Sequence, residues 1–223
     1  MSEFFLRDMT ADGLSSYVAR QLSTYFPDGR SIQAQTLQPH MDEALERTRR
    51  CFSGIEKKKF REGDRVMFNY LHPDHYAMFL YLLSNTVSRR DRGDPLAFRL
   101  FYLNKVLHGI DVYHDTQLPE VFQFMHPVGT ILGHAKYGNF FCVYQGCSIG
   151  SGEDDVFPEL GDYVVLYAGS SVIGRSKVGS NVVVGTMALV LDRDIPDNKV
   201  VRGGAGEVVI LDNARHVRER RFR

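Results

Sequence analysis

Residues 160–190 read LGDYVVLYAGSSVIGRSKVGSNVVVGTMALV, and this stretch repeats with a period of six. One position of each hexad is always aliphatic, and the position four residues further on is always small or β-branched. The aliphatic positions are Leu160, Leu166, Val172, Val178, Val184 and Val190, and the small or β-branched positions are Val164, Ser170, Ser176, Val182 and Ala188. A period of six differs from the 3.6 of an α-helix and the 2 of a simple strand. It predicts a left-handed parallel β-helix, in which short strands joined by sharp corners stack coil upon coil.

The hexad positions predict which side chains fill this β-helix. The aliphatic residue of each hexad should point into the triangular prism, and the small residue should fit a crowded wall or corner. The same frame runs upstream in steps of six from Ile149 through Val143, Tyr137, Ile131 and Met125. A further frame, with a slip of one residue, precedes it at Val112, Leu118 and Phe124.

The frame breaks between Ile149 and Leu160, which are eleven residues apart. The excess segment, residues 151–159, reads SGEDDVFPE and is polar and acidic. Such a segment cannot form a face of a β-helix, so it is predicted to be a loop ejected from one corner.

The first half of the chain has no six-residue period, and its apolar residues recur at helical spacing. Two helices are predicted over residues 14–25 and 39–52. A third should begin at Asp64, which could cap it, and a fourth should run from Asp94-Pro95 to Gly109. The chain is therefore predicted to be α+β, with an α-helical N-terminal domain over 1–108 and a β-helix domain over 109–206. Residues 207–223 hold five arginines and are predicted to form a solvated basic tail.

Composition limits the classes of function. The 223 residues carry a formal net charge of zero, which removes the usual electrostatic argument for nucleic acid or an anionic membrane surface. No window approaches the length of a membrane span, and the first ten residues lack the layout of a signal peptide. Three cysteines do not suggest a disulfide framework. These features predict a soluble cytoplasmic protein.

Several motifs of the β-helix half resemble a known family. His126 heads the stretch His-Pro-Val-Gly-Thr-Ile-Leu-Gly, and Asp111 precedes it by fifteen residues. This arrangement is similar to that of the serine O-acetyltransferases, whose catalytic histidine heads a His-x-x-Gly-x-[Ile/Val]-[Val/Leu]-Gly stretch and follows an orienting aspartate at the same spacing. The segment QGCSIG at 145–150, the acidic loop and Asp94-Pro95 also match family features. The resemblance covers about residues 94–209.

The resemblance implies an acetyl-CoA-dependent O-acetyltransferase that works through a ternary complex. His126 would be the general base and Asp111 its partner. An alcohol is too weak an acid to attack a thioester unaided at neutral pH, and a histidine can take its proton during the attack. A carboxylate on the far ring nitrogen fixes the tautomer and stabilises the imidazolium. By position in the family pattern, Ala168, Gly185 and Thr186 would bind acetyl-CoA.

Two departures from the family pattern concern the acceptor. Met125 stands where the family has an acidic residue before its catalytic histidine, and Val156-Phe157-Pro158 stands where the family has Arg-His-Pro. A zwitterion without charge partners incurs a large desolvation cost. A hydroxyl on a sugar, a nucleotide sugar or a surface polysaccharide is therefore the alternative to serine. Asp94, Phe157 and His134 are the predicted acceptor-side residues.

Two other readings of the chain predict different behaviour. A zinc enzyme of the γ-carbonic anhydrase type needs three converging histidines, but His126 and His134 are eight residues apart and the next histidine is His216. No metal is therefore predicted. A non-catalytic β-helix scaffold would leave His126 and Asp111 without a chemical role, and this alternative stays open.

The predicted prism also suggests an assembly. Flat grooved faces with small residues are usually buried in a three-fold assembly, with the donor site shared between chains. A homotrimer is therefore expected. In the family, the helical domains pair two trimers, so a hexamer is a further possibility. The expected partners are acetyl-CoA and a small-molecule or carbohydrate acceptor.

Overall fold

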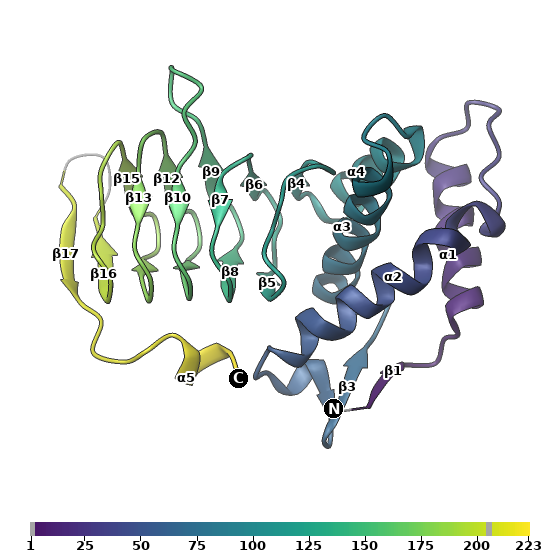
Figure 1. Cartoon of the computed structure of the whole chain (residues 1–223), viewed down its shortest axis with the longest axis horizontal. Helices are drawn as coiled ribbons and strands as arrows, with labels where there is room; N and C mark the ends of the chain where they lie inside the picture. The colour runs from purple at the N-terminus through teal and green to yellow at the C-terminus, as the bar shows by residue number, and fades with distance from the viewer. Residues whose placement is uncertain (1–2, 204–206) are drawn as a thin grey trace.

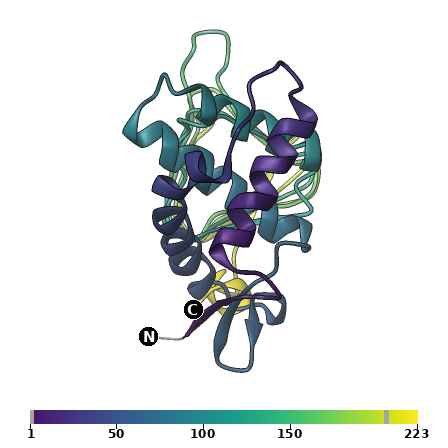
Figure 2. The ribbon, with the colours of Figure 1, turned by 90° about the vertical axis from the view of Figure 1, so that its right-hand side faces the viewer.

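The computed structural model describes residues 3–203 and 207–223, and a helical half lies across one end of a parallel β-helix (Figure 1). Viewed from the helical side, the helices lie over the end of the coil (Figure 2). The helices of this half are α1 (Ala11–Tyr25), α2 (Ala34–Ser53), the 3₁₀ helix η1 (Lys58–Phe60), α3 (Pro73–Arg90) and α4 (Pro95–His108). Helix α3 is central, and residues 74–88 are all buried because α2, α4 and the β-helix pack around it.

Three of the predicted helices are confirmed, with differences at their ends. Helix α1 begins at Ala11, three residues before its predicted start, because the Thr10 side chain caps the first turn. Helix α4 begins as predicted, since the Asp94 carboxylate accepts a hydrogen bond from the Leu96 N–H. It also ends as predicted, at Gly109, which has a left-handed φ of 63°.

The helix predicted after Asp64 is wrong. Strand β2 (Arg61–Glu62) and strand β3 (Arg65–Phe68) form an antiparallel hairpin there, and β3 also pairs with β1 (Phe4–Leu6). Gly63 in the turn has a φ of 59°, a conformation that glycine adopts without steric cost. Asp64 therefore lies in a turn, and the apolar residues after it belong to a strand.

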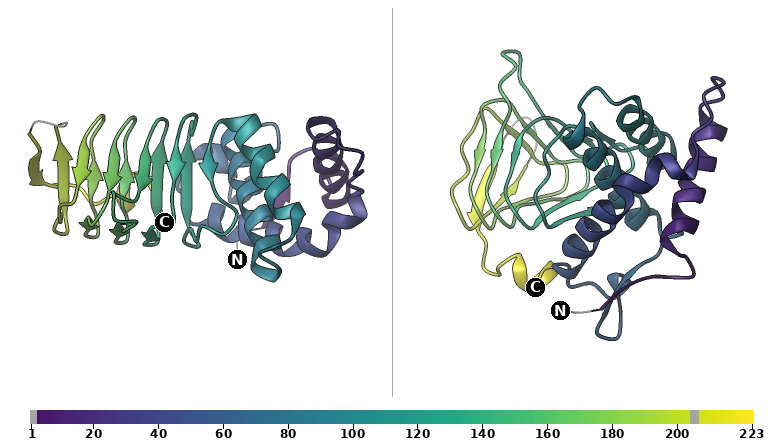
Figure 3. Two further views of the ribbon diagram at one scale, coloured as in Figure 1. Left: turned by 90° about the horizontal axis from the view of Figure 1, so that it is seen from above. Right: turned by 45° about the vertical axis from the view of Figure 1, so that its right-hand side comes forward.

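The second half is a left-handed parallel β-helix, as predicted, with three walls (Figure 3). The first face contains β4 (Asp111–Val112), β6 (Ile131–Leu132), β9 (Ser148–Gly150), β12 (Ser171–Ile173) and β15 (Leu189–Leu191). The second face contains β7 (Lys136–Tyr137), β10 (Glu159–Leu160) and β13 (Lys177–Val178). The third face contains β5 (Phe122–Met125), β8 (Phe141–Tyr144), β11 (Val165–Leu166), β14 (Val183–Val184), β16 (Lys199–Arg202) and the antiparallel β17 (Val209–Asp212).

The hexad positions of residues 160–190 are buried as predicted. Each of the six aliphatic positions is at most 5% exposed. Ser170 and Ser176 are fully buried among them, and the Ser176 hydroxyl donates a hydrogen bond to the Ile173 carbonyl. A small side chain therefore fits these positions, and at Ser176 its hydroxyl finds a partner in the backbone of its own coil.

The upstream frame differs from the predicted one. Ile131 lies beside Ser148 and is 51% exposed, whereas Leu132 lies beside Ile149 and points into the prism. The prediction that Ile131 fills the interior is therefore wrong by one residue. The spacing from Leu132 is eight residues back to Phe124 and five residues on to Tyr137, so a fixed period of six misses Leu132 from either side.

The predicted loop is confirmed between β9 and β10, where it projects from the prism (Figure 1). It differs from the prediction at one end, because Glu159 already belongs to β10. The predicted domain boundary at residue 206 lies outside the described residues.

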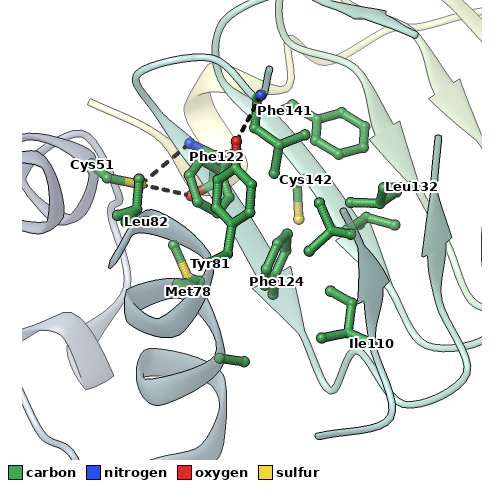
Figure 4. Packing of buried hydrophobic residues seen from close by; sticks show 14 of the residues in the cluster. Cys51, Met78, Tyr81, Leu82, Ile110, Phe122, Phe124, Leu132, Phe141 and Cys142 are labelled. Carbon is green, nitrogen blue, oxygen red and sulfur yellow. Dashed lines mark hydrogen bonds between the residues drawn. The ribbon is translucent and has the colours of Figure 1, made fainter. Parts of the chain in front are cut away.

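The two halves share one hydrophobic core at the contact of α3 with β5 (Figure 4). The Tyr81 ring meets the Phe122 ring edge-on at 5.4 Å and lies 6.4 Å from the Phe124 ring. The Cys51 thiol donates a hydrogen bond to the Phe122 carbonyl at 3.2 Å. The hydrophobic packing is therefore continuous across the boundary between the helical half and the β-helix, which the chain crosses at Gly109.

The prediction of a solvated C-terminal tail is wrong. It runs back from the far end of the β-helix to the helical half and includes α5 (Arg218–Arg221) (Figure 1). Arg221 is buried, and its guanidinium donates to the hydroxyls of Tyr144 and Tyr167. Phe222 packs on Phe140, and the tail backbone accepts from and donates to residues 54–56. Tertiary contacts along the third face thus order a segment that is basic in composition.

Arg221→Ala is expected to lower the free energy of unfolding by about 1–3 kcal/mol, because it leaves two tyrosine hydroxyls without their buried donor. Arg218 lies in the same short helix and is exposed, so Arg218→Ala is the matched control, with an effect below about 0.5 kcal/mol. Urea denaturation of both variants measures the difference. Equal stabilities would show that the Arg221 guanidinium contributes no more to the fold than an exposed arginine.

Candidate active site

His126 lies on a corner that is longer than the other corners of the same column. The inward residues Phe124 and Leu132 flank this corner and are eight residues apart. Their partners in the next coil, Val143 and Ile149, are six residues apart. The corner between the third face and the first face therefore holds two additional residues.

The hydrogen-bond register identifies the two additional residues. Met125 lies beside Tyr144 at the end of β5. The Val128 carbonyl accepts a hydrogen bond from the Gly146 N–H, so the regular stacking resumes there. Residues 126 and 127, His-Pro, thus form a bulge that has no counterpart in the next coil.

The bulge projects the His126 ring from the wall. The backbone of His126 has a φ of 50°, an uncommon value for a residue with a side chain. The Val128 N–H donates to the His126 carbonyl at 2.8 Å and closes the bulge. The imidazole is 70% exposed, so it is accessible to a ligand.

A carboxylate from the helical half contacts the bulge. Asp74, in the first turn of α3, accepts a hydrogen bond from the His126 N–H through Oδ1 at 3.1 Å. The same oxygen lies 3.9 Å from His126 Nδ1. Asp74 is only 4% exposed, and its Oδ2 forms an ion pair with Lys59. Sequence reasoning missed this residue, whose only signal is an acidic side chain in the first turn of a helix.

The predicted pairing of Asp111 with His126 is not formed within the described chain. Asp111 begins β4 on the first face, beside Ile131. Its Oδ2 accepts a hydrogen bond from Lys105 Nζ at 2.6 Å. The last turn of α4 therefore holds this carboxylate, and Asp74 takes the place beside the imidazole.

The three residues predicted to bind acetyl-CoA lie together at the corner that carries His126. The Met187 N–H donates to the Ala168 carbonyl, so Thr186 lies beside Ala168 in the next coil. Gly185 precedes Thr186 at the end of the third face. Gly129, Gly146 and Gly169 succeed one another along the corner with φ values of 75°, 66° and 70°. Three successive coils therefore have a glycine at this corner, and the exposed side chains of Val128 and Met187 lie beside them.

Two predicted acceptor-side residues lie together at the next corner, after β6. His134 Nε2 lies 2.6 Å from Asp115 Oδ1. The Phe157 ring of the ejected loop meets the His134 ring edge-on at 6.1 Å. A hollow of about 530 Å³ lies further along this side, between the loop and Arg175. His126 and His134 thus occupy opposite ends of one strand of the first face.

Asp94 is not brought to either corner of the described chain. It caps the N-terminus of α4, and the C-terminal end of that helix contacts the corner through the Gly109 carbonyl and the Gly129 N–H. Fourteen residues of helix at 1.5 Å each place Asp94 about 20 Å from that contact. Its observed role is that of a helix cap.

Two other histidines near α3 are held neutral by burial. Burial lowers the pKa of His75 to about 2, and its Nδ1 accepts a hydrogen bond from the Asn69 N–H. Burial also lowers the pKa of His108 to about 4. These rings belong to the core of the helical half, and His126 is more exposed than both.

The free energy of unfolding is expected to fall as the pH falls below about 6.5, because the unfolded chain binds a proton at His75 and the folded chain does not. The slope from this residue is at most about 1.4 kcal/mol per pH unit. Urea denaturation between pH 7.5 and 5 measures it. His75→Phe should give a shallower slope, and an unchanged slope would contradict the assignment.

Neither a membrane-spanning helix nor a metal-binding cluster occurs in the part of the chain that the structure describes. Within residues 3–203 and 207–223, no helix combines the length and apolar content of a membrane span. The same residues contain no group of three histidine, cysteine or acidic side chains placed to hold a metal ion.

Comparisons with known proteins agree with this architecture. No family model matches the chain. It is 31% identical over 122 residues to a serine acetyltransferase of Synechococcus elongatus, an alignment that covers 52% of the chain and 49% of the relative. It is 27% identical over 146 residues to that of Helicobacter pylori, covering 64% and 84%. The chain thus spans about half the length of the first of these relatives.

Solved serine acetyltransferases share the fold. The structure from Neisseria gonorrhoeae superposes with a TM-score of 0.68 at 21% identity, over 92% of this chain and 80% of that one. The structure from Brucella abortus superposes with a TM-score of 0.66 at 17% identity, over 91% and 83%. A further serine acetyltransferase, solved in complex with CoA, gives 0.65 at 18% identity, over 91% and 86%. In sequence over its β-helix half and in overall fold, this chain is similar to serine acetyltransferases.

Proposed function

We propose that this protein is an acetyl-CoA-dependent O-acetyltransferase that transfers an acetyl group to a hydroxyl in a ternary complex. The observation that carries the proposal is the exposed imidazole of His126, projected by a bulge at the head of a corner with a glycine in each of three coils. A general base at the end of a corner with accessible backbone suits attack on an extended thioester.

In this proposal, His126 removes the proton of the acceptor hydroxyl as its oxygen attacks the thioester carbonyl. A carbon–oxygen bond forms, and the carbon–sulfur bond of the tetrahedral intermediate then breaks. The imidazolium returns the proton to the departing CoA thiolate. Direct transfer is supported by the cysteines, since Cys51, Cys142 and Cys147 are all buried and burial raises the pKa of each thiol.

The donor is proposed to lie along the corner that Ala168, Gly185 and Thr186 share with His126. Its pantetheine arm would contact backbone groups at Gly129, Gly146 and Gly169, which have no side chains to cover them. A solved neighbour of the same fold is a complex with CoA, which supports this donor. Use of acetyl-CoA agrees with the cytoplasmic location expected from composition.

Serine is the first candidate acceptor, because the curated relatives are serine acetyltransferases and a solved neighbour is a complex with serine. A sugar hydroxyl is the second candidate, and a specific contact favours it. The Phe157 ring lies against His134, beside Val156, which is also partly exposed. An aromatic and aliphatic loop tip suits the apolar face of a sugar better than a zwitterion.

We further propose a homotrimer, in which the His126 corner of one copy faces the His134 corner of the next. Within one chain these corners lie at opposite ends of β6. Large apolar side chains are exposed on the first face and its His126 corner, at Val128, Ile131, Met187 and Leu191. A neighbouring copy would cover them and complete the site. Sedimentation equilibrium tests the trimer and separates it from a hexamer.

The function is tested by release of free thiol from acetyl-CoA in the presence of serine, free sugars or nucleotide sugars. The expected result is release that depends on one acceptor class and exceeds the acceptor-free rate. Calorimetric titration with CoA accompanies the assay. Failure to bind CoA, together with no acceptor-dependent release, would favour the non-catalytic scaffold.

A further inference from the structure

The His126 bulge needs a hydrogen-bond acceptor from outside the β-helix. Regular coils satisfy their N–H groups through carbonyls of the adjacent coil. The additional residues of the bulge have no counterpart in the next coil, so the His126 N–H lacks a ladder partner. The Asp74 carboxylate supplies the acceptor at 3.1 Å. The helical half thereby completes the hydrogen bonding of a corner in the other half.

We propose that Asp74 is the positioning residue for His126: one buried carboxylate holds the bulge through the backbone N–H and orients the imidazole through Nδ1. The inference rests on the proposed function, because it assigns a role to the carboxylate that faces the proposed base. It also makes the helical half part of the site, since Asp74 belongs to α3.

The surroundings of Asp74 suit a fixed orienting group. Its side chain is 4% exposed, and Lys59 holds Oδ2 so that Oδ1 faces the bulge. Helix α3 is buried along residues 74–88, which limits movement of its first turn. Asp111, the alternative carboxylate, is more exposed and is paired with Lys105. A buried carboxylate that is held in one orientation stabilises a nearby imidazolium more strongly than an exposed carboxylate does.

The geometry also assigns the two ring nitrogens. Nδ1 faces Asp74 Oδ1 at 3.9 Å, which leaves Nε2 to face the ligand. A carboxylate at that position favours the tautomer with the proton on Nδ1, so Nε2 is free to accept the proton of the hydroxyl. The separation is longer than a hydrogen bond, and such contacts often shorten in the substrate complex.

Three variants separate charge from packing. Asp74→Asn keeps an oxygen for the His126 N–H and removes the charge, and Asp74→Ala removes both. Asp12 is the matched control, because it is the second residue of α1 as Asp74 is the second residue of α3. We expect Asp74→Asn to lower kcat/KM about tenfold through kcat, with the KM for acetyl-CoA unchanged. Asp74→Ala should lower kcat/KM further, and Asp12→Asn should match the wild type.

A second measurement does not depend on activity. The tautomer of His126 is measured from the ¹⁵N chemical shifts of its ring nitrogens, which are assigned through His126→Ala. Loss of the carboxylate that faces Nδ1 should lower the share of the tautomer with its proton on Nδ1 in Asp74→Asn. The charged and titratable groups around Asp74 and the bulge are Lys59, His72, His108, Lys105 and Asp111, and all are unchanged in this variant.

The outcomes are distinct. A changed tautomer ratio in a protein that acetylates nothing would support the positioning role and reject the proposed function. An unchanged tautomer ratio and an unchanged kcat in a folded Asp74→Asn protein would overturn the positioning role. A tautomer change and a rate loss seen only in Asp111→Asn would give the role to Asp111 instead.

Discussion

His126→Ala is expected to lower kcat/KM for acetyl transfer by about 10²–10⁴-fold, because the acceptor hydroxyl loses the group that takes its proton. The ring is 70% exposed, so the variant should fold with nearly unchanged stability. Initial rates of thiol release measure the loss. Calorimetric binding of CoA should be retained, because the proposed donor contacts lie further along the corner.

The exposed His134 provides the comparison. His134→Ala also removes an imidazole, but from the corner proposed for the acceptor. Its main expected effect is a higher KM for the acceptor, with a smaller change in kcat. A loss of kcat in His134→Ala that exceeds the loss in His126→Ala would transfer the role of base to His134.

Phe124→Ala is expected to lower the free energy of unfolding by about 3–5 kcal/mol, because the ring is fully buried where α3 meets the β-helix. Its removal leaves a cavity beside Tyr81 and Phe122 that rigid helices and strands cannot fill (Figure 4). Urea denaturation followed by circular dichroism measures the change. Phe98, a partly exposed aromatic of α4, is the control, and Phe98→Ala should have a much smaller effect.

The same experiment tests whether the two halves fold as one unit. Because one cluster of buried residues runs from α1 to the last coils, the helical signal and the tyrosine fluorescence should change at the same urea concentration. In Phe124→Ala both midpoints should fall together. Two separate transitions would show that the halves are independent domains despite their shared packing.

The parts of the fold that the sequence predicted are those set by local repetition. Each hexad of the repeat indicates which side chain points inward. The β-helix, its buried serines and the ejected loop could therefore be predicted without a structure. Caps are equally local, which is why Asp94 and Gly109 mark the ends of α4. The hairpin at residues 61–68 escaped prediction because its apolar residues fit helical spacing as well.

The site divides in the same way. Sequence by itself determined the β-helix, its glycine corner and the histidine at the head of that corner, since each depends on neighbours in one chain segment. Tertiary structure decided the rest: the bulge that projects His126, the choice of Asp74 over Asp111 as its neighbour, and the burial of Arg221. These contacts join residues 52 and 77 positions apart. Their formation depends on how helices pack on the end of the coil, and no periodicity along the chain encodes that packing.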